Sequence, residues 1–364
     1  MSASLNLGRY SGIKVQIHWT FWLLFIFIGF LVIANEGGAE DLFWNFLFIF
    51  ALFFCVVLHE FGHALAARRY GIGTRSITLL PIGGVASLKD MPDDPKQEFV
   101  IAIAGPIVNV VIAFLLYLIV PVENFLVDDP ELFEEQLDGI NAANFLFYLL
   151  TVNVILVLFN MIPAFPMDGG RVFRAVLSTR MNRVQATKAA AALGKFMALI
   201  FFLFGLFFNI ILAIIAVFIY FGAHSENIMI QQISLLEGND IRDAMITDFT
   251  TLKPDETLQH AVDRILASTE QDFIVAANGK PIGILFMADL AQALREKSRN
   301  TPVREVMNEN FVTLEASAPL PSAYRQFRRG DRNFFPIVDN GELIGVLDMN
   351  NINEFLTLRA AYDY

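Results

Sequence analysis

The chain has 364 residues, of which 55% are hydrophobic and only 17% are charged, whereas an ordinary soluble domain has about 25% charged residues. Its net charge of −11 argues against a protein that binds nucleic acid directly. The single cysteine, Cys55, excludes a disulfide framework, and the first apolar run is too long for a cleavable signal peptide. Residues 1–224 are mostly apolar, and the remainder has the composition of an acidic soluble domain.

Six apolar stretches are candidates for membrane-spanning helices, which need about 20 residues each. The sixth is the shortest, and only a Phe-Phe-Asn sequence separates it from the fifth. The stretches cover residues 16–34, 43–66, 98–120, 144–165, 187–206 and 209–223. We therefore expect a multi-span α-helical membrane protein with about six transmembrane helices over residues 1–224.

The segments between these stretches alternate in charge. Basic residues precede the first stretch and follow the second and the fourth, whereas residues 35–42 and 121–143 include acidic residues and no Lys or Arg. The positive-inside rule then places the N- and C-termini in the cytoplasm. We expect a multi-pass integral protein of a prokaryotic cell membrane.

The second stretch contains a His-Glu-x-x-His motif formed by His59, Glu60 and His63. Two histidines four residues apart lie on one face of a helix, so both can bind one metal ion. Glu60 can then act as general base on water at that metal. The motif also occurs by chance in soluble helices, but ionisable groups inside a membrane span are costly and mark function. The sequence therefore predicts a metal site.

A carboxylate follows the fourth stretch at a predicted helix break. Pro163 and Pro166 end the helix, and Gly169 and Gly170 allow a sharp turn beside Asp168. As a loop cap this carboxylate would be unremarkable. A catalytic zinc, however, needs a third protein ligand and an open position for water. We predict that Asp168 is that ligand.

Two other polar residues in apolar stretches each have two interpretations. His18 is either an interfacial histidine beside an aromatic residue or a polar group that points into the site. Asn109 follows a Gly-Pro pair in the third stretch. It either hydrogen-bonds to another helix or donates to a developing oxyanion. Both residues are candidates for contacting the substrate or the transition state.

Residues 74–88 have the pattern of two short strands around Pro81 and Gly83-Gly84. The segment is apolar but too short to span a membrane. We expect a re-entrant β-hairpin packed against the helices, because non-helical backbone at membrane depth must be covered by protein or line a cavity. The alternative is a hairpin on the protein surface. Its edge could pair with an extended substrate peptide.

Three motifs together resemble the site-2 protease family of intramembrane zinc metalloproteases. They are the His-Glu-x-x-His motif, the later Gly-Pro-x-x-Asn, and Asn-x-x-Pro-x-x-Pro-x-Asp-Gly-Gly-Arg at residues 160–171. This chain has Met167 where many relatives have Leu. The resemblance implies one Zn²⁺ per chain, Glu60 as the base, and membrane-tethered protein substrates in a lipid bilayer. The implied zinc ligands are His59, His63 and Asp168.

The soluble half repeats once, with an offset of 62 residues and no gap. Asn278-Gly279 matches Asn340-Gly341, and each unit has the pattern strand–helix–strand–strand–helix with Asn-Gly as a tight hairpin turn. The duplication resembles a tandem pair of cystathionine-β-synthase (CBS) domains, small α/β modules that often bind adenine nucleotides. We expect a linker at 225–239 and CBS domains at 240–299 and 300–364.

The two repeats keep the nucleotide motif to different degrees. Nucleotide-binding relatives carry a hydroxyl three residues after the glycine of the last strand, and an Asp six residues after it. The first repeat has Phe286 and Asp289 at these positions, and the second has Asp348 and Asn351. We therefore expect at most one adenine-nucleotide site, centred on Asp289. The alternative role of the pair is homodimerisation or substrate docking.

The sequence thus predicts an intramembrane zinc endopeptidase with a cytoplasmic CBS pair. A competing interpretation is a CBS-regulated membrane transporter or channel that uses the same polar residues as an ion pathway. Inverted repeats would support a transporter, and we find none in the sequence. A catalytically inactive scaffold is a third interpretation, against which the intact Glu60 argues.

Overall fold

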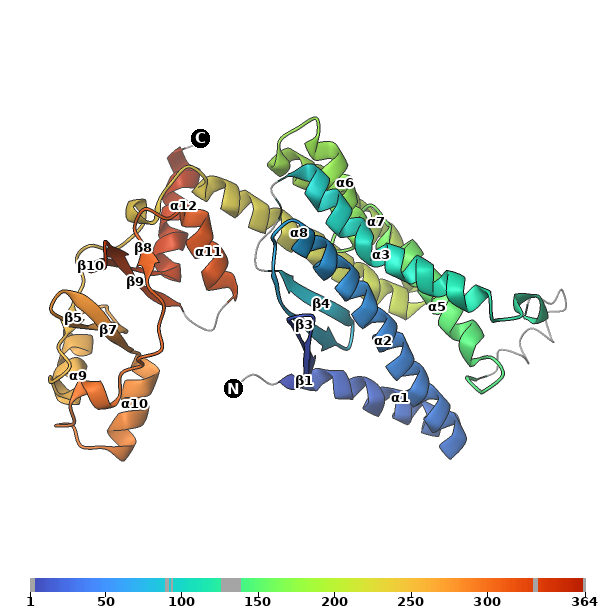
Figure 1. Ribbon diagram of the computed structural model, residues 1–364, viewed down its shortest axis with the longest axis horizontal. Coiled ribbons are helices and arrows are strands. Elements are labelled where there is room, and N and C mark those ends of the chain that lie inside the picture. The colour runs from blue at the N-terminus through green and yellow to red at the C-terminus, as the bar shows by residue number, and fades with distance from the viewer. Residues whose placement is uncertain (1–3, 89–91, 93, 126–138, 330–332, 363–364) are drawn as a thin grey trace. The chain divides into compact units, whose positions relative to one another are not determined.

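The computed structural model describes residues 4–88, 92, 94–125, 139–329 and 333–362. The chain divides into two compact units, which we call unit 1 (Met1–Ile228) and unit 2 (Met229–Tyr364) (Figure 1). Most of the acidic segment 121–143, on which the expected orientation partly depends, lies outside the described residues.

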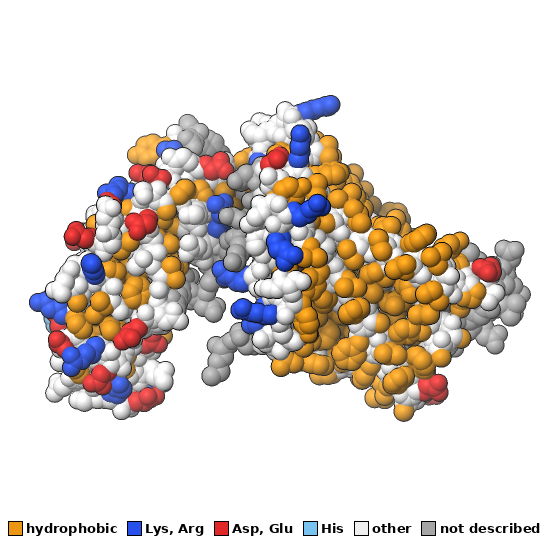
Figure 2. Space-filling model, viewed as in Figure 1, with side chains coloured by type: hydrophobic (Ala, Val, Ile, Leu, Met, Phe, Trp, Pro, Cys, Tyr) orange, Lys and Arg blue, Asp and Glu red, His pale blue; other side chains and the backbone are white. Residues whose placement is uncertain are grey.

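Unit 1 is built mainly from apolar helices. Two shorter apolar ones are α1 (Trp22–Ala34) and α5 (Phe145–Asn160), and α6 (Asp168–Ser178) follows α5. Among the residues that the structure describes, four helices are long and apolar enough to cross a membrane: α2 (Ala39–Arg69), α3 (Pro95–Tyr117), α7 (Arg183–Phe208) and α8 (Ile210–Leu236). Hydrophobic side chains cover most of the visible face of unit 1, and Lys and Arg side chains gather at one end (Figure 2). Helices suited to a membrane are therefore present, while the count of six spans stays a prediction.

Unit 1 also contains a four-stranded sheet with the order β1-β2-β3-β4. Its strands are β1 (Ser4–Tyr10), β2 (Ile13–His18), β3 (Thr74–Leu80) and β4 (Gly83–Leu88). β2 and β3 are parallel, and the two flanking pairs are antiparallel. The two strands predicted in 74–88 are present, but they form half of a larger sheet. Whether they enter the membrane stays a prediction.

The predicted start of the first span is wrong. The sequence predicts helix from residue 16, whereas Ile13–His18 form a strand and α1 begins at Trp22. Alternate residues Ile13, Val15 and Ile17 are buried, which is the period of a strand with one face on a core. In the sequence these three apolar residues come just before the apolar helix, so composition alone does not reveal where the strand ends and the helix begins.

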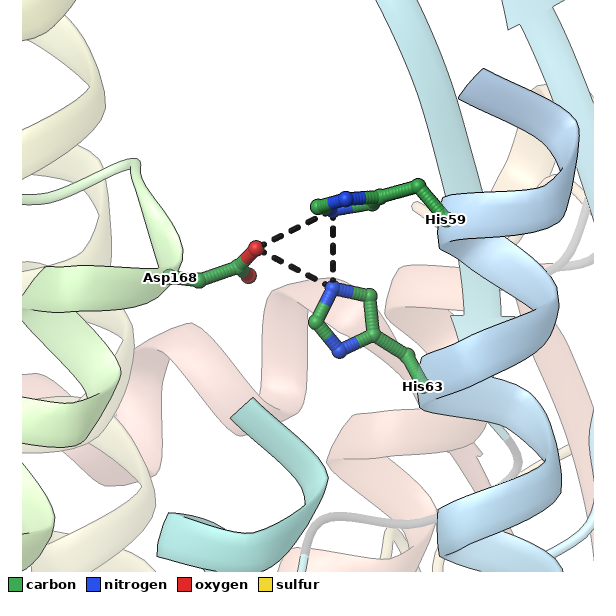
Figure 3. A group of neighbouring side chains, drawn as sticks. All are labelled: His59, His63 and Asp168. Atoms are coloured by element: carbon green, nitrogen blue, oxygen red, sulfur yellow. Dashed lines mark hydrogen bonds and ion pairs between the residues drawn. The ribbon is translucent and has the colours of Figure 1, made fainter. Parts of the chain in front are cut away.

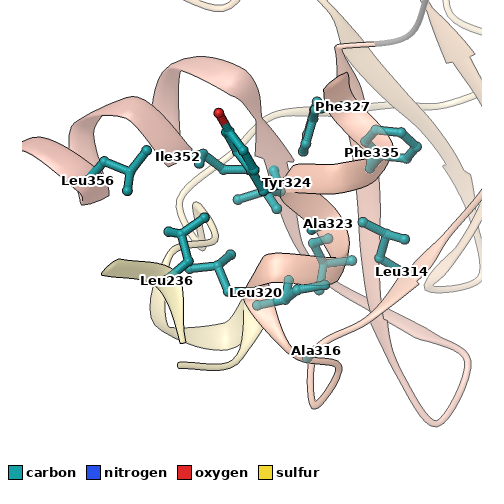
Figure 4. Close-up of a cluster of buried hydrophobic side chains, with 13 residues drawn as sticks. Leu236, Leu314, Ala316, Leu320, Ala323, Tyr324, Phe327, Phe335, Ile352 and Leu356 are labelled. Atoms are coloured by element: carbon teal, nitrogen blue, oxygen red, sulfur yellow. The ribbon is translucent and has the colours of Figure 1, made fainter. Parts of the chain in front are cut away.

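The predicted linker 225–239 is helical over most of its length, because α8 continues to Leu236. The helix ends in apolar residues that join the core of unit 2. There Leu236 packs with Leu320, Tyr324 and Ile352 (Figure 4). In addition, the Tyr324 hydroxyl donates to Gln232 Oε1 at 2.6 Å. The polar residues that suggest a linker are therefore part of a helix that begins in unit 1 and ends in unit 2.

Unit 2 contains two modules, each with the predicted order strand–helix–strand–strand–helix. The first consists of β5 (Thr251–Leu252), α9 (Leu258–Ala267), β6 (Phe273–Ala277), β7 (Lys280–Leu285) and α10 (Met287–Glu296). The second consists of β8 (Leu314–Glu315), α11 (Leu320–Arg329), β9 (Phe334–Asp339), β10 (Glu342–Asp348) and α12 (Met349–Tyr362). Both Asn-Gly pairs have positive φ at each residue, as the predicted tight hairpin turn requires.

The duplication extends to side-chain packing. A Cβ added to Gly283 would lie 2.6 Å from Sδ of Met307, and one added to Gly345 would lie 2.8 Å from Sδ of Met245. These glycines and these methionines are each 62 residues apart. Each module therefore needs a glycine in its last strand, because a methionine from the segment that precedes the other module packs against it.

Candidate metal centre

His59, His63 and Asp168 point toward one another (Figure 3). The Nε2 atoms of the two histidines are 3.1 Å apart, and Asp168 Oδ2 lies 3.2 Å from Nε2 of His59 and 3.0 Å from Nε2 of His63. The three residues are 6–8% exposed. The histidines are on α2, and Asp168 is the first residue of α6, directly after the proline-containing break. The structure thus brings together the three residues that the sequence predicts as ligands.

The hydrogen bonds of the other ring nitrogens indicate the protonation of the two imidazoles. His63 Nδ1 lies 2.7 Å from the carbonyl oxygen of Ile101, which can only accept. His59 Nδ1 lies 2.5 Å from Asn109 Oδ1. Both Nδ1 atoms therefore donate, and in the neutral rings both Nε2 atoms carry a lone pair.

When both rings are neutral, three electron-rich atoms with no hydrogen between them therefore face one point. Such atoms repel one another unless a cation lies between them, and burial makes the repulsion stronger. Their separations of 3.0–3.2 Å are close to the ligand–ligand distance of about 3.3 Å that tetrahedral zinc bonds of about 2.0 Å produce. The donor set of two imidazoles and one carboxylate therefore fits zinc.

Gly105 keeps the space beside the histidines open. A Cβ at this position would lie 2.7 Å from Nε2 of His59 and still closer to Nε2 of His63. Only glycine therefore allows α3 to approach the three converging residues. Pro106 follows within the same helix, which is continuous through it.

Asn109 joins three helices. Its Oδ1 accepts from His59, its Nδ2 donates to Asn153 Oδ1 at 2.8 Å, and Asn153 Nδ2 donates to the Leu149 carbonyl at 2.8 Å. Both asparagines are fully buried. This is the helix–helix role that the sequence offers for Asn109, and the oxyanion role stays a prediction. Asn153 was not among the predicted site residues, although an amide in an apolar helix is a usable signal.

Glu60 is half-buried beside β4 rather than inside the group of three. Its Oε2 accepts a hydrogen bond from the Ala86 backbone N–H at 3.1 Å. A Cβ at Gly84 would lie 2.8 Å from Cγ of Glu60. The glycine therefore lets β4 approach this carboxylate closely.

His18 has local partners. Its Nδ1 lies 2.7 Å from Thr20 Oγ1, and its ring centroid is 5.9 Å from that of Trp19. Among the described residues, the group that could hold a metal does not include it. These contacts favour the interfacial interpretation of His18.

A buried ion-pair network lies on the same helices and was not predicted. Arg174 on α6 is 2% exposed. Its Nε donates to Glu98 Oε1 on α3 at 2.8 Å, and its Nη1 donates to Glu226 Oε1 on α8 at 2.6 Å. The three residues are far apart in sequence, so no local pattern pairs them.

Asp289 lies in the first turn of α10 and is half-buried. Burial raises the pKa of nearby Asp272, and the negative charges of Asp348 and Asp289 raise it further. Asp348 also caps α12. Its carboxylate Oδ1 accepts from the Asn351 backbone N–H at 2.8 Å, and its own backbone N–H donates to the Asn351 side-chain Oδ1 at 3.1 Å. The departures of the second repeat therefore have a structural role, and the surroundings of Asp289 are acidic.

Known proteins resemble both halves of the chain. Residues 47–204 match peptidase family M50, and residues 241–296 and 303–357 each match the CBS domain. A zinc metalloprotease from Methanocaldococcus jannaschii is 35% identical over 353 residues, which are 97% of this chain and 96% of that protein. A CBS domain-containing protein from Bacillus subtilis is 26% identical over 31% of this chain and 83% of its own length. The solved structure of a site-2 protease from M. jannaschii is 41% identical, with a TM-score of 0.47, and covers 62% of this chain and 95% of that one.

Proposed function

Because the chain belongs to peptidase family M50, the site-2 protease family of zinc metalloproteases, we propose that it cleaves peptide bonds within or near the transmembrane segments of membrane-tethered proteins. Membership of a peptidase family favours an enzyme over the transporter or channel interpretation. The observation that carries the proposal is the buried group of His59, His63 and Asp168 among apolar helices.

We assign one zinc ion per chain to His59, His63 and Asp168. The support is the lone pairs of both Nε2 atoms and the Asp168 carboxylate, which face one point. When bound, zinc supplies a Lewis acid that polarises a carbonyl and makes water more acidic. Asn109 and the Ile101 carbonyl keep the imidazoles in the tautomer that presents Nε2.

Glu60 is the general base in this proposal. It takes a proton from the attacking water, whose oxygen bonds to the carbonyl carbon, and it later gives the proton to the leaving nitrogen as the C–N bond breaks. The hydrogen bond from Ala86 orients its carboxylate. Because β4 is an edge strand of the four-stranded sheet, an extended substrate paired along it would pass beside Glu60.

We propose that the six apolar helices described above, α1, α2, α3, α5, α7 and α8, lie in a prokaryotic cell membrane. We also propose that the β3–β4 hairpin is re-entrant and that both termini are cytoplasmic. The Lys and Arg side chains at one end of unit 1 (Figure 2) support this orientation. The basic last turn of α2, with Arg68 and Arg69, follows the metal-binding turn of the same helix. This arrangement would open the site toward the cytoplasm.

For the CBS pair we propose a regulatory, dimerising or docking role, with at most one adenine-nucleotide site at Asp289. A carboxylate there can accept from ribose hydroxyls. The nearby Asp272 and Asp348 disfavour phosphates at short range. Calorimetry on the full chain with adenosine, AMP and ATP tests this, and binding that Asp289→Ala abolishes supports the site. If none of the three ligands gives a heat of binding, homodimerisation or substrate docking is the remaining role of the pair.

The test of the proposed activity is Glu60→Gln in the purified full-length protein. We expect zinc content to be kept and cleavage of membrane-tethered substrates to be lost, because glutamine cannot take a proton. Glu40→Gln is a matched control, since Glu40 is an exposed carboxylate in the first turn of the same helix. Membrane proteomes of cells that carry either variant would identify the substrates. Wild-type cleavage rates in Glu60→Gln would reject Glu60 as the base.

A further inference from the structure

The segment that leads into Asp168 packs against α8. Met167 and Ala164 share a buried cluster with Ile219, and Phe165 shares another with Ala223. Ile219 and Ala223 are completely buried. Both residues belong to α8, so this helix covers the backbone just before the proposed carboxylate ligand.

Gly222 makes the closest approach in this contact. A Cβ at Gly222 would lie 2.8 Å from both Cδ and Cγ of Pro166. The ring of Pro166 is rigid, so it cannot move aside without moving the backbone two residues before Asp168. The distance between α8 and this segment is therefore set by the absence of a side chain at residue 222.

One helical turn further along α8, Glu226 forms a polar connection to the same region. Its Oε1 accepts from Nη1 of Arg174 at 2.6 Å, and Arg174 is on α6, the helix that Asp168 begins. The guanidinium also lies 4.9 Å from the centroid of the Phe165 ring. Helix α8 is thus connected to both sides of Asp168, through Pro166 before it and through Arg174 after it.

We propose that α8 positions Asp168 for metal binding, with Gly222 and Glu226 as the positioning residues. This inference rests on the proposed zinc site. The two histidines share α2, and α3 holds their Nδ1 atoms, whereas Asp168 comes from a separate break between helices. Metal–ligand distances tolerate changes of only about 0.2 Å. The fit of the third ligand therefore depends on the packing of α8.

A series of glycine-to-alanine variants tests the proposal, because each adds the same methyl group and improves helix propensity. In Gly222→Ala the methyl meets Pro166 at 2.8 Å, and in Gly194→Ala it meets Ala164 and Ala223 at 3.3 Å. In Gly29→Ala, on α1, the nearest atom is 3.7 Å away, an ordinary contact. The measurements are Zn²⁺ affinity of the zinc-free full-length protein, by competition with a chromophoric chelator, and its thermal midpoint.

We expect Gly222→Ala to weaken zinc binding by about 10-fold or more, on the scale of other indirect changes to metal ligands. Gly194→Ala should have a smaller effect and Gly29→Ala none. Glu226→Gln keeps an acceptor oxygen but removes the charge, and it should also weaken zinc binding. This variant tests the proposal if Gly222→Ala does not fold. Wild-type zinc affinity in both Gly222→Ala and Glu226→Gln would overturn the proposal, as would an equal loss in Gly29→Ala. A wild-type protein that binds no zinc would instead reject the proposed metal site.

Discussion

Units 1 and 2 differ in whether they bury polar side chains. Among the residues that the structure describes, no charged, amide or imidazole side chain is buried in unit 2. Unit 1 buries His59, His63, Glu98, Asn109, Asn144, Asn153, Asp168, Arg174 and Thr187. The unit with the most apolar composition therefore holds the buried polar groups.

The difference indicates where the chemistry of the protein is. A buried polar group is costly unless it has a partner, and those of unit 1 that lie near the metal centre are connected to one another across α2, α3, α5, α6 and α8. Unit 2 is held together by apolar cores, and its ion pairs are exposed. Matched substitutions should therefore have much larger effects in unit 1.

The largest expected contrast is between two aspartates. Asp168→Ala should remove bound zinc and lower cleavage by about 10³-fold or more, as loss of an essential catalytic group does. Asp255→Ala in unit 2 removes an exposed ion pair with Arg304 and should change neither. Zinc content by atomic absorption and cleavage of a reconstituted substrate check both variants. If Asp168→Ala kept the zinc content of the wild type, another residue would be the third ligand.

Two arginines provide the next contrast. Arg174→Met removes the ion pair of Glu226 with Arg174 and leaves Glu98 with only its longer pair to Arg183, at 3.9 Å. This loss of buried pairing should destabilise unit 1 by about 3–5 kcal/mol. Arg242→Met breaks the exposed pair with Asp339 and should cost less than about 1 kcal/mol. Thermal unfolding in detergent compares the two. Equal unfolding midpoints for Arg174→Met and Arg242→Met would mean that water reaches the ion pairs of Arg174.

A smaller effect is expected at Asn153. Asn153→Leu keeps a side chain branched at Cγ but removes the acceptor that orients the Asn109 amide. Zinc affinity should fall about 10- to 100-fold, the usual range for groups that orient a metal-bound histidine. Asn45→Leu, on α2 and away from the metal centre, is the control. If thermal stability fell and zinc affinity did not, the role of Asn153 would be to pack the helices and not to orient the metal ligands.

The smallest expected effect concerns Asp272 in unit 2. Partial burial, and then the charges of Asp348 and Asp289, raise the pKa of Asp272. Its contribution therefore favours folding in acid and is lost as pH rises through that raised pKa. Asp272→Asn keeps an acceptor for the Met287 N–H and should stabilise unit 2 at pH 7, by less than about 1 kcal/mol. The gain should shrink as pH falls. A gain that does not depend on pH would have another origin.

Local patterns predict most of the architecture. The apolar stretches locate the long helices, the prolines at 163 and 166 locate the end of α5, and the Asn-Gly pairs locate both hairpin turns of unit 2. These features are predictable because hydrophobic periodicity and turn chemistry act over a few residues. The convergence of His59, His63 and Asp168 was also predictable, although the last is more than 100 residues away in sequence. A zinc site needs a third ligand, and Asp168 is the carboxylate at a helix break.

Other features depend on contacts that a single sequence does not encode locally. Strand β2 merges with the apolar start of the next helix, and only its alternating burial reveals it. The polar end of α8 suggests a linker because the partner of Glu226 is Arg174, 52 residues away. Gly222 has no distinctive neighbours in sequence, and its importance comes from the Pro166 ring beside it.

Helix α8 has a consequence for equilibrium binding. It carries Gly222 and Glu226 in unit 1, and its end contributes Leu236 to the core of unit 2. A ligand that binds unit 2 and alters α8 would change the affinity of unit 1 for zinc. Thermodynamic linkage then requires zinc to change the affinity of the protein for that ligand by the same factor. Screening small molecules against the protein with and without zinc would therefore reveal effectors by a difference in affinity, before any substrate is known.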